Sequence, residues 1–138
     1  KDEYKIMQEH VVDSGRILKE YVHPDIYKIA VRHHEKLDGS GYPLGLTGDH
    51  LSREERICAV ADIISALIRK RSYKQVFSKE QTLKILGDMA RRNQICPEVT
   101  EAVSMNYDFL MEEIDKNGER LMLIYQQMKD ETERCSGC

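Results

Sequence analysis

The sequence predicts an all-α fold of five to six helices. Apolar residues recur at intervals of three and four in one stretch after another, the spacing of one face of an α-helix. No segment alternates convincingly between apolar and polar residues, as a half-buried strand does. Residues 38–51 hold four glycines and one proline, too many helix breakers for regular structure. We therefore expect helices with short connections and one long irregular loop.

Two helices are expected before this loop and a third directly after it. Residues 1–22 carry an apolar stripe at helical spacing, and residues 23–37 follow with Pro24 in a first turn, where proline is favoured. Residues 52–73 form the third helix, which begins with Ser52 and Glu55 at capping-box spacing. Its expected buried stripe comprises Ile57, Val60, Ala61, Ile64, Leu67 and Ile68.

The remaining helices follow from similar signals. Residues 78–93 begin with Ser78 and Gln81, again at capping-box spacing. Pro97 opens a fifth helix, and "KNG" at residues 116–118 predicts a stop before a last helix. The last helix carries an apolar stripe formed by Leu121, Ile124, Tyr125 and Met128.

Composition narrows the class of protein. The 138 residues are 41% hydrophobic and 33% charged, which is typical of one globular domain. The net charge of −3 argues against a general binder of nucleic acid polymers or of membrane surfaces. No apolar run approaches the ~20 residues of a membrane span, and the first residues do not resemble a signal peptide. We expect a cytoplasmic protein.

The four cysteines give a weaker signal. Cys58 lies in an apolar run and is expected to be a buried thiol. Cys135 and Cys138 form a "CSGC" ending, half of a zinc-ribbon pattern with no second pair. A frayed tail with free thiols is the favoured interpretation of this ending.

A candidate metal site is suggested by four side chains. His33 and His34 are adjacent, and with Glu35 and Asp38 they concentrate metal-type ligands just before the loop. We expect His10, His33, His34 and Asp62 to meet. Imidazole and carboxylate ligands suit iron, manganese, zinc or nickel. Taken singly, His10 fits equally well as a surface or capping residue, and Asp62 as a carboxylate on the solvent edge of its helix.

A second feature is the cationic segment "RKRSYK" at residues 69–74. Cations at the end of a helix complement its dipole, and this interpretation is slightly favoured by the local sequence. The alternative is a phosphate clamp, in which Arg71 gives bidentate contacts and Lys74 a point charge.

These motifs together resemble the HD-GYP family, a branch of the HD-domain metal phosphohydrolases. The resemblance is carried by "HHEKLDGSGYPLGLTG", by "RICAVAD" and by "RSYK", with "EHVVDSGRIL" similar to an earlier family helix. It covers residues 3–109, so we expect residues 1–109 to form a partial HD-GYP-like domain. Residues 110–138 are then a helical extension and tail.

The resemblance implies an HD-domain-like helical bundle that hydrolyses cyclic di-GMP at a site of two or three metal ions. Iron and manganese rank ahead of zinc and nickel as the divalent metal. By this resemblance the metal ligands are His10, His33, His34 and Asp62, and the phosphate contacts are Arg71 and Lys74. The signature loop contains Asp38, Gly39, Gly41, Tyr42 and Pro43.

The sequence also departs from the family pattern. The His-Asp pair that names the family lies upstream of the His10 helix in its members, and these 138 residues contain no such dipeptide. The catalytic residues that this segment supplies are therefore unknown here. Ser65 stands where the family has an aspartate, and Ser72 where it has a proline.

Two hypotheses of different classes follow. In the first, the parent protein is a cyclic di-GMP phosphodiesterase using metal-activated water, and this chain alone is inactive. In the second, the chain is a degenerate, non-catalytic regulatory or binding module. A general HD-type nucleotide phosphohydrolase ranks third. An upstream sensory or receiver domain is expected in the parent protein, and the last helix either covers apolar surface of its own chain or forms a homodimer.

Overall fold

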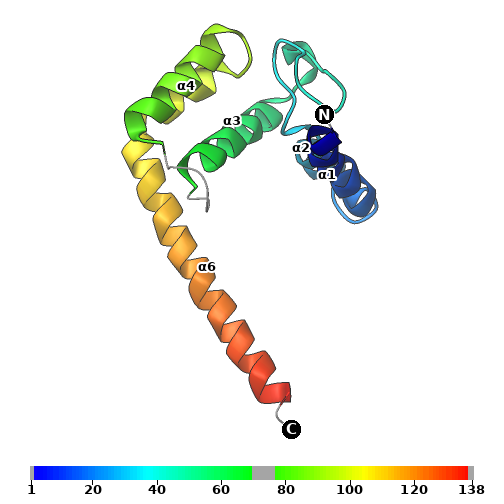
Figure 1. The fold of residues 1–138 in the computed structure, drawn as a ribbon, viewed down its shortest axis with the longest axis vertical. Helices are drawn as coiled ribbons and strands as arrows, with labels where there is room; N and C mark the ends of the chain where they lie inside the picture. Colours follow the sequence, from blue (N-terminus) through cyan, green and yellow to red (C-terminus); the bar gives the residue numbers. More distant parts are fainter. Residues whose placement is uncertain (1, 70–76, 137–138) are drawn as a thin grey trace. The chain divides into compact units, whose positions relative to one another are not determined.

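The computed structural model describes residues 2–69 and 77–136 and contains only helices and loops in these ranges, so the all-α prediction is confirmed (Figure 1). The α-helices are α1 (Asp2–Leu18), α2 (Pro24–Arg32), α3 (Arg53–Ile68), α4 (Lys79–Arg91), α5 (Pro97–Met105) and α6 (Tyr107–Ser136), and a 3₁₀ helix, η1, spans Gly48–His50. The chain divides into two compact units, Lys1–Ala102 and Val103–Cys138, which are described separately below.

The first unit is built by helices packed in chain order: α1 against α2, α2 against α3, and α3 against α4. Gly15 lets α1 approach α2 closely, because a Cβ atom there would lie 3.1 Å from Val31 Cγ1. The fully buried apolar side chains of this unit come from three helices and comprise Val11, Val60 and Leu86.

The predicted starts of α2, α3 and α4 are confirmed. Pro24 is the first residue of α2, where its missing N–H leaves no intrahelical bond unmade. Ser52 and Ser78 both head complete capping boxes, in which the serine hydroxyl accepts from the third backbone N–H of the helix. The Glu55 and Gln81 side chains reach back to the backbone N–H of these serines.

The buried face of α3 differs from the predicted one. Val60 and Ile64 are buried as expected, but Ile57 is 45% exposed and Ala61 is exposed. The buried residues of α3 are Glu55, Ala59, Val60 and Ile64. The prediction followed hydrophobicity alone, whereas the helix turns Glu55 inward, where its carboxylate accepts from Arg32 of α2 at 3.1 Å.

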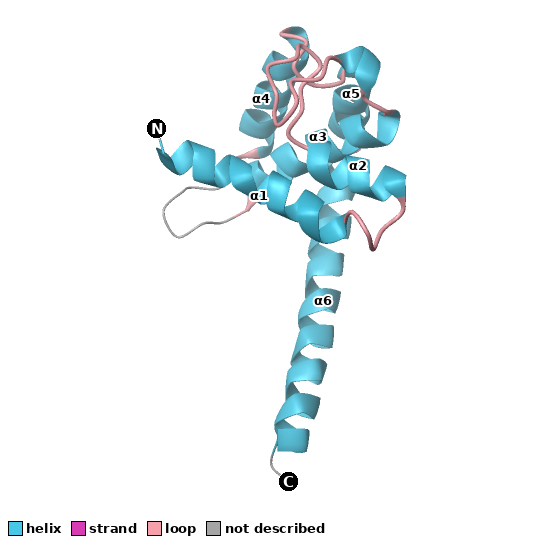
Figure 2. Cartoon of the chain, turned by 90° about the vertical axis from the view of Figure 1, so that its right-hand side faces the viewer, coloured by secondary structure: helices cyan, strands magenta, loops and turns pink. Residues whose placement is uncertain are grey.

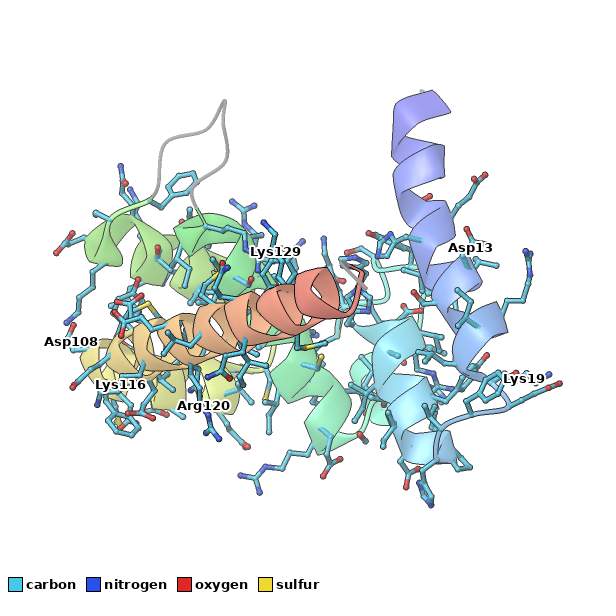
Figure 3. All side chains as sticks on the ribbon, turned by 90° about the horizontal axis from the view of Figure 1, so that it is seen from below. Asp13, Lys19, Asp108, Lys116, Arg120 and Lys129 are labelled. Atoms are coloured by element: carbon cyan, nitrogen blue, oxygen red, sulfur yellow. The ribbon has the colours of Figure 1, made fainter. Side chains whose placement is uncertain are left out.

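The second unit consists mainly of α6, which runs without interruption for 30 residues (Figure 2). The predicted stop at residues 116–118 is therefore wrong, and the break falls at Asn106 instead. Local interactions explain why the helix continues. The Asn117 side chain donates to the Glu113 carbonyl at 2.7 Å, and Lys116, labelled in Figure 3, pairs with Glu112 at 2.9 Å. Gly118 weakens a helix interior by only about 1 kcal/mol.

The side chains of α6 between residues 114 and 129 are all exposed. They include the predicted apolar stripe of Leu121, Ile124, Tyr125 and Met128, whose exposed fractions range from 43% to 66%. Across the two described ranges, no helix is at once long and apolar enough to cross a lipid bilayer.

Candidate metal centre

Three imidazole rings meet where α1 passes the end of α2. His10 comes from α1, and His33 and His34 directly follow the last residue of α2. One ring nitrogen of each lies within 4.8 Å of the others. His34 Nε2 and His10 Nε2 are 3.3 Å apart. Two nitrogens of a tetrahedral site with metal–nitrogen bonds of about 2.0–2.1 Å are separated by about 3.4 Å, so this spacing suits a shared metal ion.

The orientation of His33 is fixed by the backbone of α2. Its Nδ1 lies 2.8 Å from the Ala30 carbonyl oxygen. A carbonyl oxygen can only accept, so Nδ1 carries a proton, and in a neutral imidazole the lone pair is then on Nε2. Fixing the tautomer through the second ring nitrogen is the usual arrangement of a metal-binding histidine.

His34 lies in the middle of the cluster. Burial, followed by the neighbouring His33, lowers its pKa from 6.5 to about 4, and the nearby Asp62 opposes this only in part. The imidazole is therefore neutral at pH 7 and retains the lone pair that a metal requires. Three imidazoles form a donor set that fits a divalent transition metal.

Asp62 stands at the edge of the cluster. Its Oδ2 lies 3.6 Å from His34 Nδ1, and its side chain is 43% exposed. The carboxylate thus approaches His34 alone, at Nδ1, whereas Nε2 of the same ring approaches His10. Three of the four expected side chains therefore converge within 4.8 Å, and Asp62 is not one of them. Cys58 lies one turn earlier on α3, where burial and the charge of Asp62 raise the pKa of its thiol. This thiol is partly exposed, not buried as predicted.

The signature loop is ordered by its own polar groups. Asp38 accepts from the backbone N–H of Ser40 at 2.9 Å and from its hydroxyl at 2.7 Å. These two hydrogen bonds, with the hydroxyl bond the larger effect, lower the pKa of Asp38. Gly39 takes a φ of 78°, a conformation that suits glycine. The Asp38 carboxylate thus stabilises the turn of the loop at Ser40.

Two buried carboxylates have structural roles that the sequence did not predict. Glu35, grouped above with metal-type ligands, is 2% exposed, and its two oxygens accept from the backbone N–H groups of Leu44 and Leu46. Glu55, expected only as a helix cap, is also 2% exposed and binds Arg32. A buried carboxylate must have hydrogen-bonding partners, because burying it without them is costly. This rule could have suggested such roles, but the sequence does not show which carboxylates are buried.

Other expected site residues have different outcomes. Arg71, Lys74 and Ser72 lie outside the described residues. Tyr42 stacks near the cluster, with its ring centroid 4.7 Å from that of His34 and the two planes inclined by 33°. Pro43 follows it through a cis peptide bond.

The chain is similar to a known domain family and to several bacterial phosphodiesterases. The family model described as HD domain matches residues 1–99. A 3′3′-cGAMP-specific phosphodiesterase 2 of Vibrio cholerae is 40% identical over 110 residues, which are 77% of this chain. A cyclic di-GMP phosphodiesterase of Thermotoga maritima is 35% identical over 104 residues, 73% of this chain. The cyclic di-GMP phosphodiesterase response regulator RpfG of Xanthomonas campestris is 50% identical over 58 residues, 42% of this chain.

These relatives are much longer than this chain. The matched regions cover 21%, 28% and 15% of the Vibrio, Thermotoga and Xanthomonas proteins respectively. The three-histidine cluster lies within the stretch that the family model matches.

Proposed function

The chain belongs to the HD domain family, and from this premise we propose that the protein containing it is a metal-dependent phosphodiesterase acting on a cyclic dinucleotide. The observation that carries the proposal is the convergence of His10, His33 and His34 within 4.8 Å. HD domains are metal-dependent, and relatives covering most of this chain are phosphodiesterases of cyclic di-GMP or 3′3′-cGAMP.

In this proposal the four predicted side chains hold the metal: His10, His33, His34 and Asp62. When bound, the metal supplies a water of lowered pKa and draws negative charge from a phosphate group. The chain's own contribution is to orient the imidazoles and to keep that of His34 neutral. Ala30 fixes the proton of His33 on Nδ1, and burial keeps His34 unprotonated at pH 7. We place iron or manganese ahead of zinc or nickel.

The substrate contacts are proposed from the family resemblance. Arg71 and Lys74 would neutralise the phosphate, since guanidinium binds it through two hydrogen bonds and ammonium as a point charge. Cyclic di-GMP is the substrate we favour. The 138 residues alone should be inactive, because they contain no His-Asp pair to complete a site of several metal ions.

A non-catalytic regulatory or binding module is the second candidate function. It is favoured by Ser65, which replaces an acidic residue of the family pattern on α3, the helix that carries Asp62. We further propose a cytoplasmic protein with a sensory or receiver domain before the HD-type domain. The HD-type domain would end near residue 109, and residues 110–138 would form an extension able to mediate homodimerisation.

The test compares the parent protein with this chain. The parent protein, supplied with Mn²⁺ or Fe²⁺, should hydrolyse cyclic di-GMP, and His33→Ala with His34→Ala should lower kcat at least ~100-fold. His23→Asn is the matched control, because His23 caps α2 outside the cluster and asparagine is also a good cap. Unchanged turnover in EDTA, or robust turnover by residues 1–138, would contradict the proposal.

A further inference from the structure

The carboxylate of Glu35 acts on the loop that follows it. Oε1 accepts from the Leu44 N–H at 2.7 Å, and Oε2 accepts from the Leu46 N–H at 2.9 Å. With 2% of the residue exposed, water competes little for these bonds. Hydrogen bonds from backbone N–H groups to an ionised carboxylate are stronger than bonds between neutral groups. Glu35 therefore fastens the second half of the loop to the end of α2.

The first half of the loop is held against the same backbone by close approach. A Cβ atom on Gly41 would lie 2.4 Å from both Glu35 Cα and Lys36 N. Only a residue without a side chain fits this contact. Immediately after it, the Tyr42 N–H donates to the His34 carbonyl oxygen at 3.2 Å. The loop thus closes on His34 and Glu35 from both sides.

This closure places an aromatic ring against a histidine of the metal centre. The Tyr42 and His34 rings lie 4.7 Å apart between centroids and are inclined by only 33°, as in an offset stack. His34 is in turn 3.3 Å from His10 and 3.6 Å from Asp62. A shift of the Tyr42 ring would therefore be transmitted to the nitrogen spacing of the cluster.

We propose that Glu35 is a positioning residue of the metal centre, which acts through the loop and Tyr42 to hold His34 in place without binding the metal itself. The inference rests on the proposed function, since it assigns Glu35 a role toward the metal site. Some residues orient a metal-binding histidine without being ligands themselves. Replacing such a residue commonly weakens metal binding by about 10- to 100-fold.

The test uses the full chain, Co²⁺ as the probe and two substitutions. Glu35→Gln keeps the size of the side chain but presents an NH₂ group to one of the two backbone N–H donors. Tyr42→Leu leaves Glu35 in place and removes the ring. Each should raise the Kd for Co²⁺ about 10-fold, and the double variant should be no weaker than the weaker single variant, because both act on one path.

A second readout needs no metal. In the metal-free chain, the nuclear Overhauser effects between the Tyr42 and His34 ring protons should be strong in the wild type and lost in Glu35→Gln. Two controls separate positioning from general stability. Glu54→Gln changes a fully exposed carboxylate of α3. Leu86→Ala destabilises the same unit from the buried face of α4, and it should leave the Kd for Co²⁺ unchanged where the chain is still folded.

The outcomes separate the two proposals. A Kd for Co²⁺ that Glu35→Gln raises no more than Leu86→Ala does would overturn the positioning role. If Glu35→Gln does not fold, Tyr42→Leu decides, and an unchanged Kd there overturns the inference. Absence of Co²⁺ binding by the wild type would overturn the proposed metal site. The nuclear Overhauser effects between the Tyr42 and His34 rings would then decide the role of Glu35. Their retention in Glu35→Gln would refute that role, and their loss would support it.

Discussion

The loop between α2 and α3 contains only one short 3₁₀ helix, whereas α6 is a regular helix of 30 residues. The loop nevertheless has side chains hydrogen-bonded to its backbone. Glu35 and Arg56 bind its backbone from two sides, with Arg56 Nη2 donating to Gly48 O at 2.7 Å and Nε to Leu51 O at 3.0 Å. Between residues 114 and 129, every side chain of α6 is exposed.

The difference shows that a regular backbone and a fixed position have separate causes. The helix satisfies its own N–H and C=O groups, so it can form without any tertiary partner for its side chains. The loop lacks such internal bonds along much of its length. Its backbone is instead bound by the side chains of Glu35 and Arg56 and, at Leu37, by the backbone that follows α4, because the Leu37 N–H donates to Gln94 O at 3.0 Å. A substitution should therefore be costly in the loop and cheap in α6.

The largest effect is expected for Gly41→Ala. The new Cβ atom would lie 2.4 Å from backbone atoms of Glu35 and Lys36, which cannot move aside as a flexible side chain can. We expect the free energy of unfolding to fall by about 3 kcal/mol, the upper part of the range for overpacked sites. Urea denaturation followed by circular dichroism measures this loss.

Gly48→Ala is the matched control in the same loop. Its Cβ atom would meet the Leu37 Cδ2 atom at 3.4 Å, an ordinary contact with a side chain. An equal loss of stability in the two variants would mean that the close approach at Gly41 does not govern the loop.

The second largest effect is expected from a change of pH, which should act through His34 at the start of the loop. In the metal-free folded chain the pKa of His34 is about 4, and in the unfolded chain it is 6.5. Between these values the unfolded state binds a proton that the folded state does not, so stability present above pH 6.5 is lost as the pH falls toward 4. His34→Gln should flatten this part of the stability profile. An identical slope in both proteins would show that His34 is not the group responsible.

Replacing Leu121 and Ile124 of α6 by glutamate tests whether the exposed stripe has a partner. Because the stripe is 43–66% exposed, we expect only a small loss of thermal stability. If the stripe covers apolar surface of its own chain in solution, the double variant should instead melt clearly earlier while its mass stays the same. Light scattering and thermal unfolding measure the two quantities. Conversion of a dimer into a folded monomer would instead support a symmetric helix contact, and no change in either quantity would refute both interpretations.

The smallest effect, with the opposite sign to that of Gly41→Ala, is expected for Gly118→Ala. Nothing lies within 4 Å of the new Cβ atom, and alanine loses less conformational freedom than glycine in a helix. The helix should gain about 0.5–1 kcal/mol, seen as a higher helical signal at 222 nm on heating. A loss of stability would indicate that α6 has a close neighbour at Gly118.

The sequence alone was sufficient for the starts of several helices and for part of the site, but not for the extent of α6. Helical spacing, Pro24 and the capping boxes at Ser52 and Ser78 are local signals, and they correctly predicted where α2, α3 and α4 begin. The pairing of His33 and His34, followed by a loop rich in glycine, correctly marked the place where His10 joins them. The roles of these residues as ligands stay predictions.

The tertiary structure decided which polar groups are buried and what they bind. Glu35 and Asp38 look alike in sequence, yet Glu35 is buried under the loop and Asp38 bonds to Ser40 at the surface. The buried face of α3 likewise includes Glu55, paired with Arg32, beside the apolar Ala59, Val60 and Ile64. Burying a carboxylate is favourable only when its partners are brought to it, and those partners lie up to 23 residues away along the chain. Such pairings depend on the packing of whole helices, which local sequence patterns do not specify.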